Sequence, residues 1–375
     1  MRLGIIDVTE WQTIVDFETG YPVEERGELV TLAAEILKAS PYPGDLDLAS
    51  SRWVTDTALR LWQHYQPQLM FLDYASLFLN YTFRPIPADQ FRAAVHEVFA
   101  EVERFVSQSG FTPVVVGLGD LTPFKGYIDV VHSDGQVAAG GMSSRHAGLY
   151  APSLRDIQAL RDHPAVERVD TRDDFRAELG GCDDFYRRFP DVLATAKEGY
   201  AFRGVSSGAR PIYRMPRYEA AVPWYSPLEG AEKITDVAGM VLQAAQGQRV
   251  ALILVEAVGC DTFPWPYRTI ENCHHWHHYT AGDGQYLTLS SGRQFTEHPY
   301  PPGYRFYLED HERKLYPFSG IYGQRPTGML GQRFAGRSAA VGNRSVLTHL
   351  AAGAQITVEC FARALYNQGV MAVCE

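Results

Sequence analysis

Short, continuous apolar runs separated by amphipathic segments constrain the fold of this chain most strongly. The clearest run is Arg249 to Val255, which reads RVALILV, and comparable runs cover residues 69–75 and the stretch after Thr112. Between the last two, residues 88–107 repeat apolar side chains at steps of three and four, as an amphipathic helix does. A buried strand, a helix and a second buried strand in this order predict a βαβ unit with parallel strands.

The remaining periodicity extends this pattern over the whole sequence. Helices are expected over 28–38, 55–65 (with Thr55 as a cap), 235–245 and 356–367, and strands over 3–6 and 370–373. We therefore predict an α/β fold, namely a three-layer αβα sandwich with a mostly parallel sheet, in one principal domain over residues 1–375. A small accessory α+β region is expected over 135–205, with helices at 153–162 and 172–179 and a strand at 166–169.

Composition and charge exclude several classes of protein. With 375 residues, 46% of them apolar and 21% charged, the chain can bury a large core and does not have a disordered composition. Its net charge of −10 argues against nucleic-acid binding, which requires a basic face on the protein. The longest apolar run, Val250 to Val255, is too short to span a bilayer, and no signal peptide is recognised. We expect a soluble, cytoplasmic protein without membrane or nucleic-acid partners, whose five cysteines are free thiols.

An irregular stretch over 262–334, rich in Pro, Gly, Tyr and His, is too long for an ordinary connection and predicts an insertion over a site. It contains the densest group of ionisable side chains, His274-His-Trp-His-His278. In a helix, His274 and His278 would lie on one face, four positions apart, as two zinc ligands do. The alternative is a polar, partly exposed aromatic-histidine surface.

Two further segments carry polar side chains where a parallel sheet binds ligands, beyond the carboxyl ends of its strands. Glu256 and Asp261 follow the strand that ends at Val255, and the alternative is a plain loop with solvated acids. The second segment, Gly342 to His349, offers Arg344 near the expected start of a helix, where backbone N–H groups attract anions. The alternative there is a simple helix cap.

A series of motifs between Arg52 and about Arg203 resembles a known family. The series consists of Trp53-Val-Thr-Asp-Thr-Ala-Leu, Gln66-Pro-Gln-Leu-Met-Phe-Leu-Asp, Pro113-Val-Val-Val-Gly-Leu-Gly-Asp, His163-Pro-Ala-Val-Glu-Arg-Val and Pro190-Asp-Val-Leu-Ala-Thr-Ala-Lys-Glu-Gly-Tyr-Ala-Phe. In that order the motifs are similar to the second half of type I phosphodiesterases and nucleotide pyrophosphatases of the alkaline-phosphatase superfamily. The resemblance implies a phosphoesterase ancestry, with two metal ions at the ends of parallel strands.

The first half of such an enzyme has its counterpart downstream. Ala251-Leu-Ile-Leu-Val-Glu-Ala-Val-Gly is similar to the family's opening strand, with Glu256 in place of a ligand Asp. This likeness implies a circular permutation in which residues 248–375 supply the first half and strand 370–373 lies near strand 3–6. Most other metal-ligand positions are altered, because the family's "LD..GH" ligands fall near Phe78 and Thr82, and its "SDHG" motif becomes Gly117-Leu-Gly-Asp120.

These observations lead to a functional prediction. We expect a divergent phosphoesterase-like hydrolase for a small-molecule phosphate ester, using a divalent metal such as zinc, manganese or iron. The alternative is a pseudoenzyme of the same fold that binds a small molecule or a partner protein, and a homo-oligomer is left open. In the permuted arrangement the segment from Gly342 to His349 falls near the family's nucleophile helix, so the resemblance implies Ser345 and Thr348 as candidate nucleophiles. The other candidate catalytic residues are Arg344, for anion binding, and Asp120. The candidate metal ligands are Glu256, Asp261, His274, His278 and His349.

Overall fold

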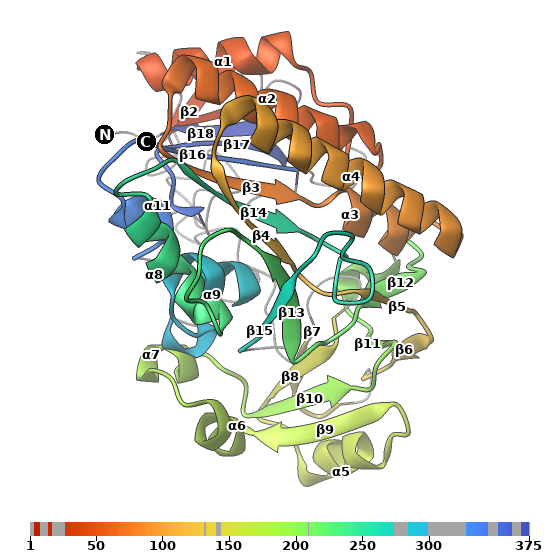
Figure 1. Ribbon diagram of the computed structural model, residues 1–375. Helices are drawn as coiled ribbons and strands as arrows, with labels where there is room; N and C mark the ends of the chain where they lie inside the picture. The colour runs from red at the N-terminus through yellow and green to blue at the C-terminus, as the bar shows by residue number, and fades with distance from the viewer. Residues whose placement is uncertain are drawn as a thin grey trace.

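A large twisted sheet with helices on both sides dominates the molecule, and a smaller sheet lies below it in Figure 1. The computed structural model describes residues 4–7, 14–16, 27–130, 133–139, 144–208, 210–273, 284–298, 328–343, 352–361 and 369–374.

The large sheet contains ten of the described strands, in the order β15-β13-β4-β14-β3-β16-β17-β18-β1-β2. The central strands are parallel to one another: β4 (Thr112–Gly117), β14 (Val250–Val255), β3 (Leu69–Tyr74), β16 (Ser338–Gly342) and β17 (Ile356–Phe361). Antiparallel strands complete both edges: β13 (Ala221–Tyr225), β15 (Arg268–Glu271), β18 (Gly369–Cys374), β1 (Gly4–Asp7) and β2 (Ile14–Asp16). The α/β class is confirmed, and the sheet is mixed.

Strand β14 lies inside the parallel core, between β3 and β4. Leu252 pairs with Phe71 of β3 on one side and with Val114 of β4 on the other. Every residue of β14 and β3 is buried. A strand covered on both faces has no exposed side, which explains why its sequence is continuously apolar rather than alternating.

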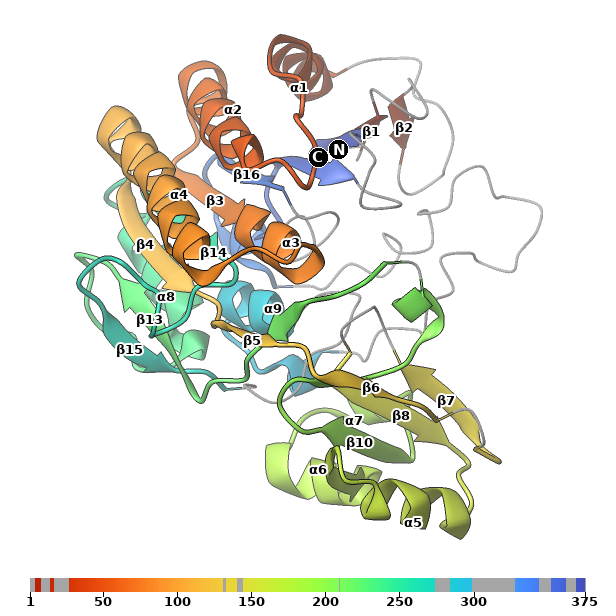
Figure 2. The same cartoon turned by 90° about the vertical axis from the view of Figure 1, so that its right-hand side faces the viewer.

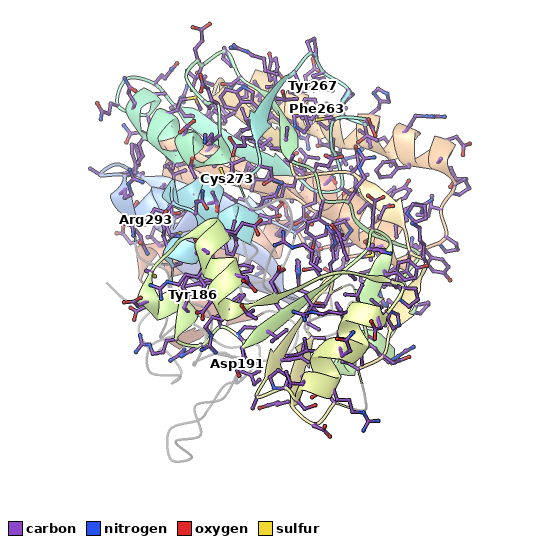
Figure 3. All side chains as sticks on the ribbon, turned by 90° about the horizontal axis from the view of Figure 1, so that it is seen from below. Tyr186, Asp191, Phe263, Tyr267, Cys273 and Arg293 are labelled. Atoms are coloured by element: carbon purple, nitrogen blue, oxygen red, sulfur yellow. The ribbon has the colours of Figure 1, made fainter. Side chains whose placement is uncertain are left out.

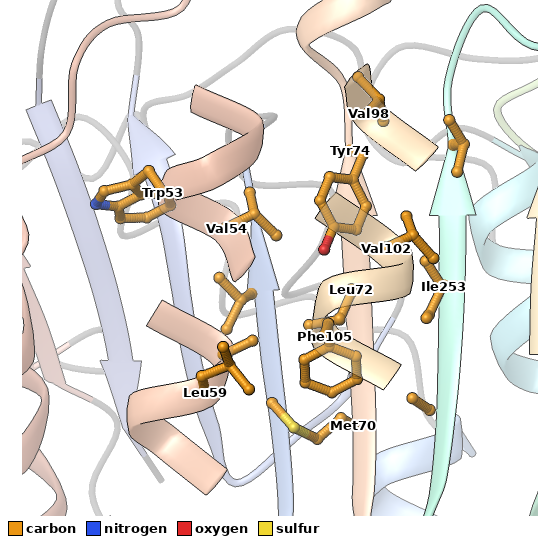
Figure 4. Packing of buried hydrophobic residues seen from close by; sticks show 14 of the residues in the cluster. Trp53, Val54, Leu59, Met70, Leu72, Tyr74, Val98, Val102, Phe105 and Ile253 are labelled. Carbon is orange, nitrogen blue, oxygen red and sulfur yellow. The ribbon is translucent and has the colours of Figure 1, made fainter. Parts of the chain in front are cut away.

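Helices cover both faces of this core (Figures 1 and 2). On one face lie α1 (Glu28–Ala39), α2 (Ala49–Tyr65), α3 (Ser76–Phe83) and α4 (Ala88–Ser109); on the other lie α8 (Ile234–Ala244), α9 (Gly284–Ser291) and α11 (Leu330–Arg333). Figure 4 shows Met70, Leu72 and Tyr74 of β3 facing side chains of α2 and α4. The alternate residues Leu69 and Phe71 belong to the cluster on the α8 face, as the period of two in a strand requires.

Two helices differ from the expectation. α2 starts at Ala49, so Thr55 lies inside the helix rather than at its cap, and its hydroxyl is 2.9 Å from that of Tyr74. The helix expected over 356–367 is wrong, because Ile356–Phe361 form strand β17. The residues at 356–358 are Ile, Thr and Val, whose β-branched side chains favour a pleated backbone beside a neighbouring strand.

The accessory region forms its own antiparallel sheet, in the order β7-β8-β10-β9. Its elements are β7 (Gln136–Ala139), β8 (His146–Tyr150), α5 (Leu154–Asp162), β9 (Val166–Thr171), α6 (Arg172–Leu179), α7 (Asp183–Tyr186) and β10 (Val192–Ala196). Ser153 and Thr171 start α5 and α6 through capping boxes with Asp156 and Asp174. Figure 3 views the molecule from the side of this region, with Tyr186 and Asp191 labelled.

Aromatic packing and two short strand pairs join the accessory region to the large sheet. Phe185 and Phe189 share a buried cluster with Leu287 of α9 and Phe295 of η2 (Phe295–Glu297). The connecting elements are β5 (Leu121–Pro123) paired with β12 (Arg214–Pro216), β6 (Gly126–Ile128) paired with β11 (Tyr200–Phe202), and the turn η1 (Val205–Gly208). The accessory sheet is therefore anchored to the rest of the molecule by a shared core.

The first and last described strands are neighbours. β1 pairs with β18, from Gly4 opposite Cys374 to Asp7 opposite Met371, so the expected proximity of strands 3–6 and 370–373 is confirmed. Within the 262–334 stretch, the described elements are β15, α9, η2 and α11. In the part of the chain that the structure describes, no helix combines the length and the apolar character needed to cross a bilayer.

Candidate functional site

The neighbouring parallel strands β3 and β14 end at the same edge of the sheet. After β3 the chain enters α3 and α4 on the α2 face, and the turn after β14 packs Phe263 on that same face before α9 packs on the α8 face. Open α/β sheets bind ligands beyond the carboxyl ends of their parallel strands. The candidate site is therefore the carboxyl end of β3 and β14.

Two buried carboxylates lie at this point. Asp73 is in β3 and Glu256 comes directly after β14, and they are 0% and 2% exposed. Asp73 continues a row of side chains on the α8 face, and so does Glu256. The apolar members of these two rows are Leu69, Phe71, Leu252 and Leu254.

Tyr286 of α9 joins the two carboxylates. Its hydroxyl donates a hydrogen bond to Asp73 Oδ1 at 3.0 Å and also contacts Glu256 Oε1. A phenol has one hydrogen to donate, so this hydroxyl can donate to only one of the two buried acids at a time. Burying a carboxylate costs free energy unless it is hydrogen-bonded, paired or bound to a cation, so two buried acids that contact one hydroxyl mark a candidate site.

The donor set fits a divalent cation in part. Asp73 and Glu256 offer carboxylate oxygens from adjacent strands, and such oxygens bind zinc, manganese and iron. Across the described residues, no group of three or more His, Cys, Asp or Glu side chains is arranged to hold a metal ion. A complete ligand set would therefore need donors from the rest of the chain, where the predicted ligands His274, His278 and His349 lie.

Asn343 ties the carboxyl ends of β16 and β3 to the start of α2. Its Oδ1 accepts a hydrogen bond from the backbone N–H of Ala75 at 2.6 Å, and its Nδ2 donates to Ser50 Oγ at 2.9 Å. The next serine of α2, Ser51, has its hydroxyl 2.5 Å from that of Ser76 at the start of α3. The buried Asn343 side chain thus fixes the point at which the chain leaves β16.

Asp120 holds the turn that begins at Glu256. Its nearly buried carboxylate accepts hydrogen bonds from the backbone N–H groups of Gly259 at 2.9 Å and Asp261 at 3.1 Å, and from the hydroxyl of Thr262. These contacts describe a residue that positions the loop after β14. The catalytic role expected of Asp120 stays a prediction.

Arg217 gathers the acidic groups around this turn. Its guanidinium contacts Asp120 Oδ2 at 3.3 Å, Asp261 Oδ2 at 2.8 Å and Glu219 Oε1 at 2.8 Å. Burial raises the pKa of Glu219; the hydrogen bond from Arg217 opposes this shift, and the charge of Asp120 adds to it. A Cβ at Gly259 would lie 2.5 Å from Asp120 N and from Glu219 Oε2, so the turn requires a glycine.

The predicted site residues fall into three groups. Asp120 and Asp261 are brought together around Arg217. Glu256 starts the same turn, but its carboxylate meets Tyr286 and so belongs with Asp73. The remaining candidates lie outside the described residues, and their roles stay predictions: His274, His278, Arg344, Ser345, Thr348 and His349.

Sequence reasoning missed Asp73 and Tyr286 as site residues. A signal for Asp73 is present, because an acid inside the apolar run LMFLDY must find a partner once the strand is buried. Tyr286 has no comparable signal, since it belongs to the stretch without clear periodicity. Only the packing of α9 against the sheet brings its hydroxyl to the strand ends.

No protein-family model matches the chain, and no curated protein matches it at a significant level.

Proposed function

We propose that this chain is a divergent phosphoesterase-like hydrolase that acts on a small-molecule phosphate ester. The observation that carries the proposal is the Asp73–Glu256 pair, two buried acids at the carboxyl ends of adjacent parallel strands. The motif series from Arg52 to about Arg203 supports it. On this proposal the core is a three-layer αβα sandwich, related to the alkaline-phosphatase superfamily by a circular permutation that agrees with the β1–β18 pairing.

The acids at the strand ends suit a reaction that uses a bound cation to stabilise developing negative charge. Asp73 and Glu256 would hold a divalent cation, such as zinc, manganese or iron, through carboxylate oxygens. When bound, that cation would stabilise the charge that builds on the phosphate oxygens. Tyr286 contacts both acids through its hydroxyl and thereby fixes their orientation.

The segment after β16 would supply the remaining groups. Asn343 fixes the place where this segment starts, through its bonds to Ala75 and Ser50. We assign the phosphate contact to Arg344, whose charge and fork of donors suit phosphate oxygens. Ser345 and Thr348 are the assigned nucleophile candidates.

Metal content and hydrolysis of two model esters test the proposal. Protein purified without a histidine tag should carry stoichiometric zinc, manganese or iron and hydrolyse nitrophenyl phosphate or bis(nitrophenyl) phosphate. Glu256→Gln and Asp73→Asn should each lower the rate about 100-fold. Asp156→Asn is the matched control, because it removes a buried carboxylate that belongs to the α5 capping box, and its rate should be unchanged. A folded protein that hydrolyses neither ester would overturn the proposal.

A pseudoenzyme that binds a small molecule or a partner protein without turnover is the second candidate. Its support is the commitment of acidic groups to the fold, since Asp120 clamps a loop and Tyr286 bonds both Asp73 and Glu256. A metal-free protein that is inert toward both esters, and that a small molecule stabilises in a thermal screen, would favour this candidate.

We also propose that the protein works in the cytoplasm. Among the described cysteines, Cys182, Cys260 and Cys273 are free thiols, as expected in a reducing compartment. Mass spectrometry of protein alkylated during cell lysis tests this, and a cysteine found in a disulfide in that sample would contradict it.

A further inference from the structure

A groove of about 910 Å³ lies between the loop that precedes α2 and the first turns of α4. One wall is the loop over residues 43–48, and the other consists of α3, α4 and the short link between these two helices. A volume of this size matches the pockets that hold small organic molecules. The groove is therefore large enough for a ligand of its own.

The groove opens on the α2 face, near the carboxyl ends of β3 and β16. Its loop leads into Ser50, which Asn343 holds at the end of β16, and its second wall includes Asn80 of α3, the helix that starts directly after β3. Tyr286 packs in the cluster on the opposite face of the sheet. The groove and the Asp73–Glu256 pair thus lie near the same strand ends, on opposite faces of the sheet.

The charged side chains that line the groove are mostly acidic. Asp45, Asp47 and Glu97 contribute carboxylates, and Arg84 contributes a guanidinium. Asp45 is 2% exposed and accepts a hydrogen bond from Tyr42 at 2.8 Å, so one negative group lies deep in the wall. A cleft lined mainly by one sign of charge concentrates ligands of the opposite sign.

The groove also has an apolar lining. Leu46, Leu48 and Ile86 contribute to it together with Ala93 and Ala94 of α4. A ligand that fills the groove must therefore remove apolar surface from water as well as match the acidic groups. A bare metal ion meets only the second of these demands, and an inorganic anion meets neither.

We propose that this groove binds a small organic cation, an ammonium group carried on an apolar alkyl or aryl body. The ammonium end lies near Glu97 and Asp47, and the apolar body lies against Leu46, Leu48 and Ile86. The proposal concerns binding only and does not depend on phosphoester hydrolysis.

Ligand-observed NMR with two probes of similar shape tests it. Benzyltrimethylammonium should bind with a dissociation constant of about 1 mM or tighter, while phenylmethanesulfonate, which has the opposite charge, should not bind. Raising the ionic strength should weaken binding of the cation, because salt screens an exposed charge such as that of Glu97.

Variants of α4 locate the binding. Glu97→Gln should weaken the cation about threefold and Glu97→Lys about tenfold, and Ala93→Trp should abolish binding by filling the groove. The matched controls are Glu103→Gln and Ala100→Trp, which change exposed residues of the same helix that do not line the groove. Equal affinity for both probes, or unchanged cation binding in folded Glu97→Lys and Ala93→Trp proteins, would overturn the proposal, whatever the outcome of the ester assays.

Discussion

Asp73 and Glu256 meet at a single hydroxyl, that of Tyr286, which lies 213 positions from Asp73 and 30 from Glu256 along the chain. The relationship joins two parallel strands and a helix from a segment without clear sequence periodicity. It gives the candidate site a definite centre and makes the phenol the group whose removal is most informative.

Replacing Tyr286 with Phe removes the hydroxyl and keeps the ring in place. The two buried acids then lose a common donor, and we expect a loss of about 1–3 kcal/mol in the free energy of unfolding. Tyr74→Phe is the control, because Tyr74 is equally buried but its hydroxyl meets the neutral Thr55. Urea denaturation measures both variants. A smaller loss for Tyr286→Phe than for Tyr74→Phe would contradict the central place given to this hydroxyl.

Asp120→Asn should loosen the turn that begins at Glu256. In the native protein, donors bind both carboxylate oxygens of Asp120, whereas the amide of Asn has only one acceptor oxygen. We therefore expect the free energy of unfolding to fall by about 2–3 kcal/mol. Asp261→Asn, at a side chain that is 69% exposed, should change stability far less. Hydrogen exchange of the Gly259 amide reports the turn directly, and unaltered protection of that amide in Asp120→Asn would count against the clamp.

His298 should make stability depend on pH. It is 4% exposed with Nε2 3.0 Å from Ser291 Oγ, and burial, followed by the charge of Arg293, lowers its pKa to about 4, although Glu297 opposes the shift. The folded state therefore disfavours the protonated ring, so this stability is present above pH 6.5 and is lost as pH falls toward 4. The full contribution of His298 to the free energy of unfolding is about 3 kcal/mol.

His298→Gln isolates this contribution, because the amide cannot take up the proton. Denaturation curves at several pH values should show the variant losing less stability than the unmodified protein between pH 6.5 and 4. Parallel pH profiles for the two proteins would refute the assignment.

Two glycines should respond to alanine with opposite signs. At Gly259 the added Cβ would lie 2.5 Å from a backbone nitrogen, so Gly259→Ala should destabilise the turn by at least about 1–3 kcal/mol. Gly239 lies in α8 with open space around it, so Gly239→Ala should stabilise the protein by about 0.5–1 kcal/mol. Thermal melts distinguish the pair, and a shift of the melting temperature in the same direction for both variants would contradict the prediction.

The elements predicted best from the sequence are those whose burial gives an apolar pattern typical of only one type of secondary structure. β14 and β3 are covered on both faces, and α4 carries an unbroken apolar stripe, so their patterns are unambiguous. The sequence predicts a helix in place of β17 because a short apolar run has no period of its own, and the pairing with β16 and β18 decides its conformation.

The candidate site was predicted only in part, for a related reason. Glu256 follows a recognisable strand, so its place at the sheet edge could be derived. The partner of Glu256 could not, because Tyr286 reaches it through the packing of α9 on the α8 face. The sequence places Asp120 and Asp261 near the strand ends. That both contact Arg217 could not be predicted, because this depends on a loop whose sequence has no periodicity.

The pairing of β1 with β18 governs the order in which the sheet can be completed during translation. One side of β1 must wait for residues 369–374, which form the last of the described strands to be synthesised, after β17 at 356–361. Nascent chains stalled before residue 369 should therefore expose an open strand edge, attractive to other unfinished chains. Pulse proteolysis of such stalled chains should cut within residues 1–16, and resistance there would show that β1 finds another neighbour.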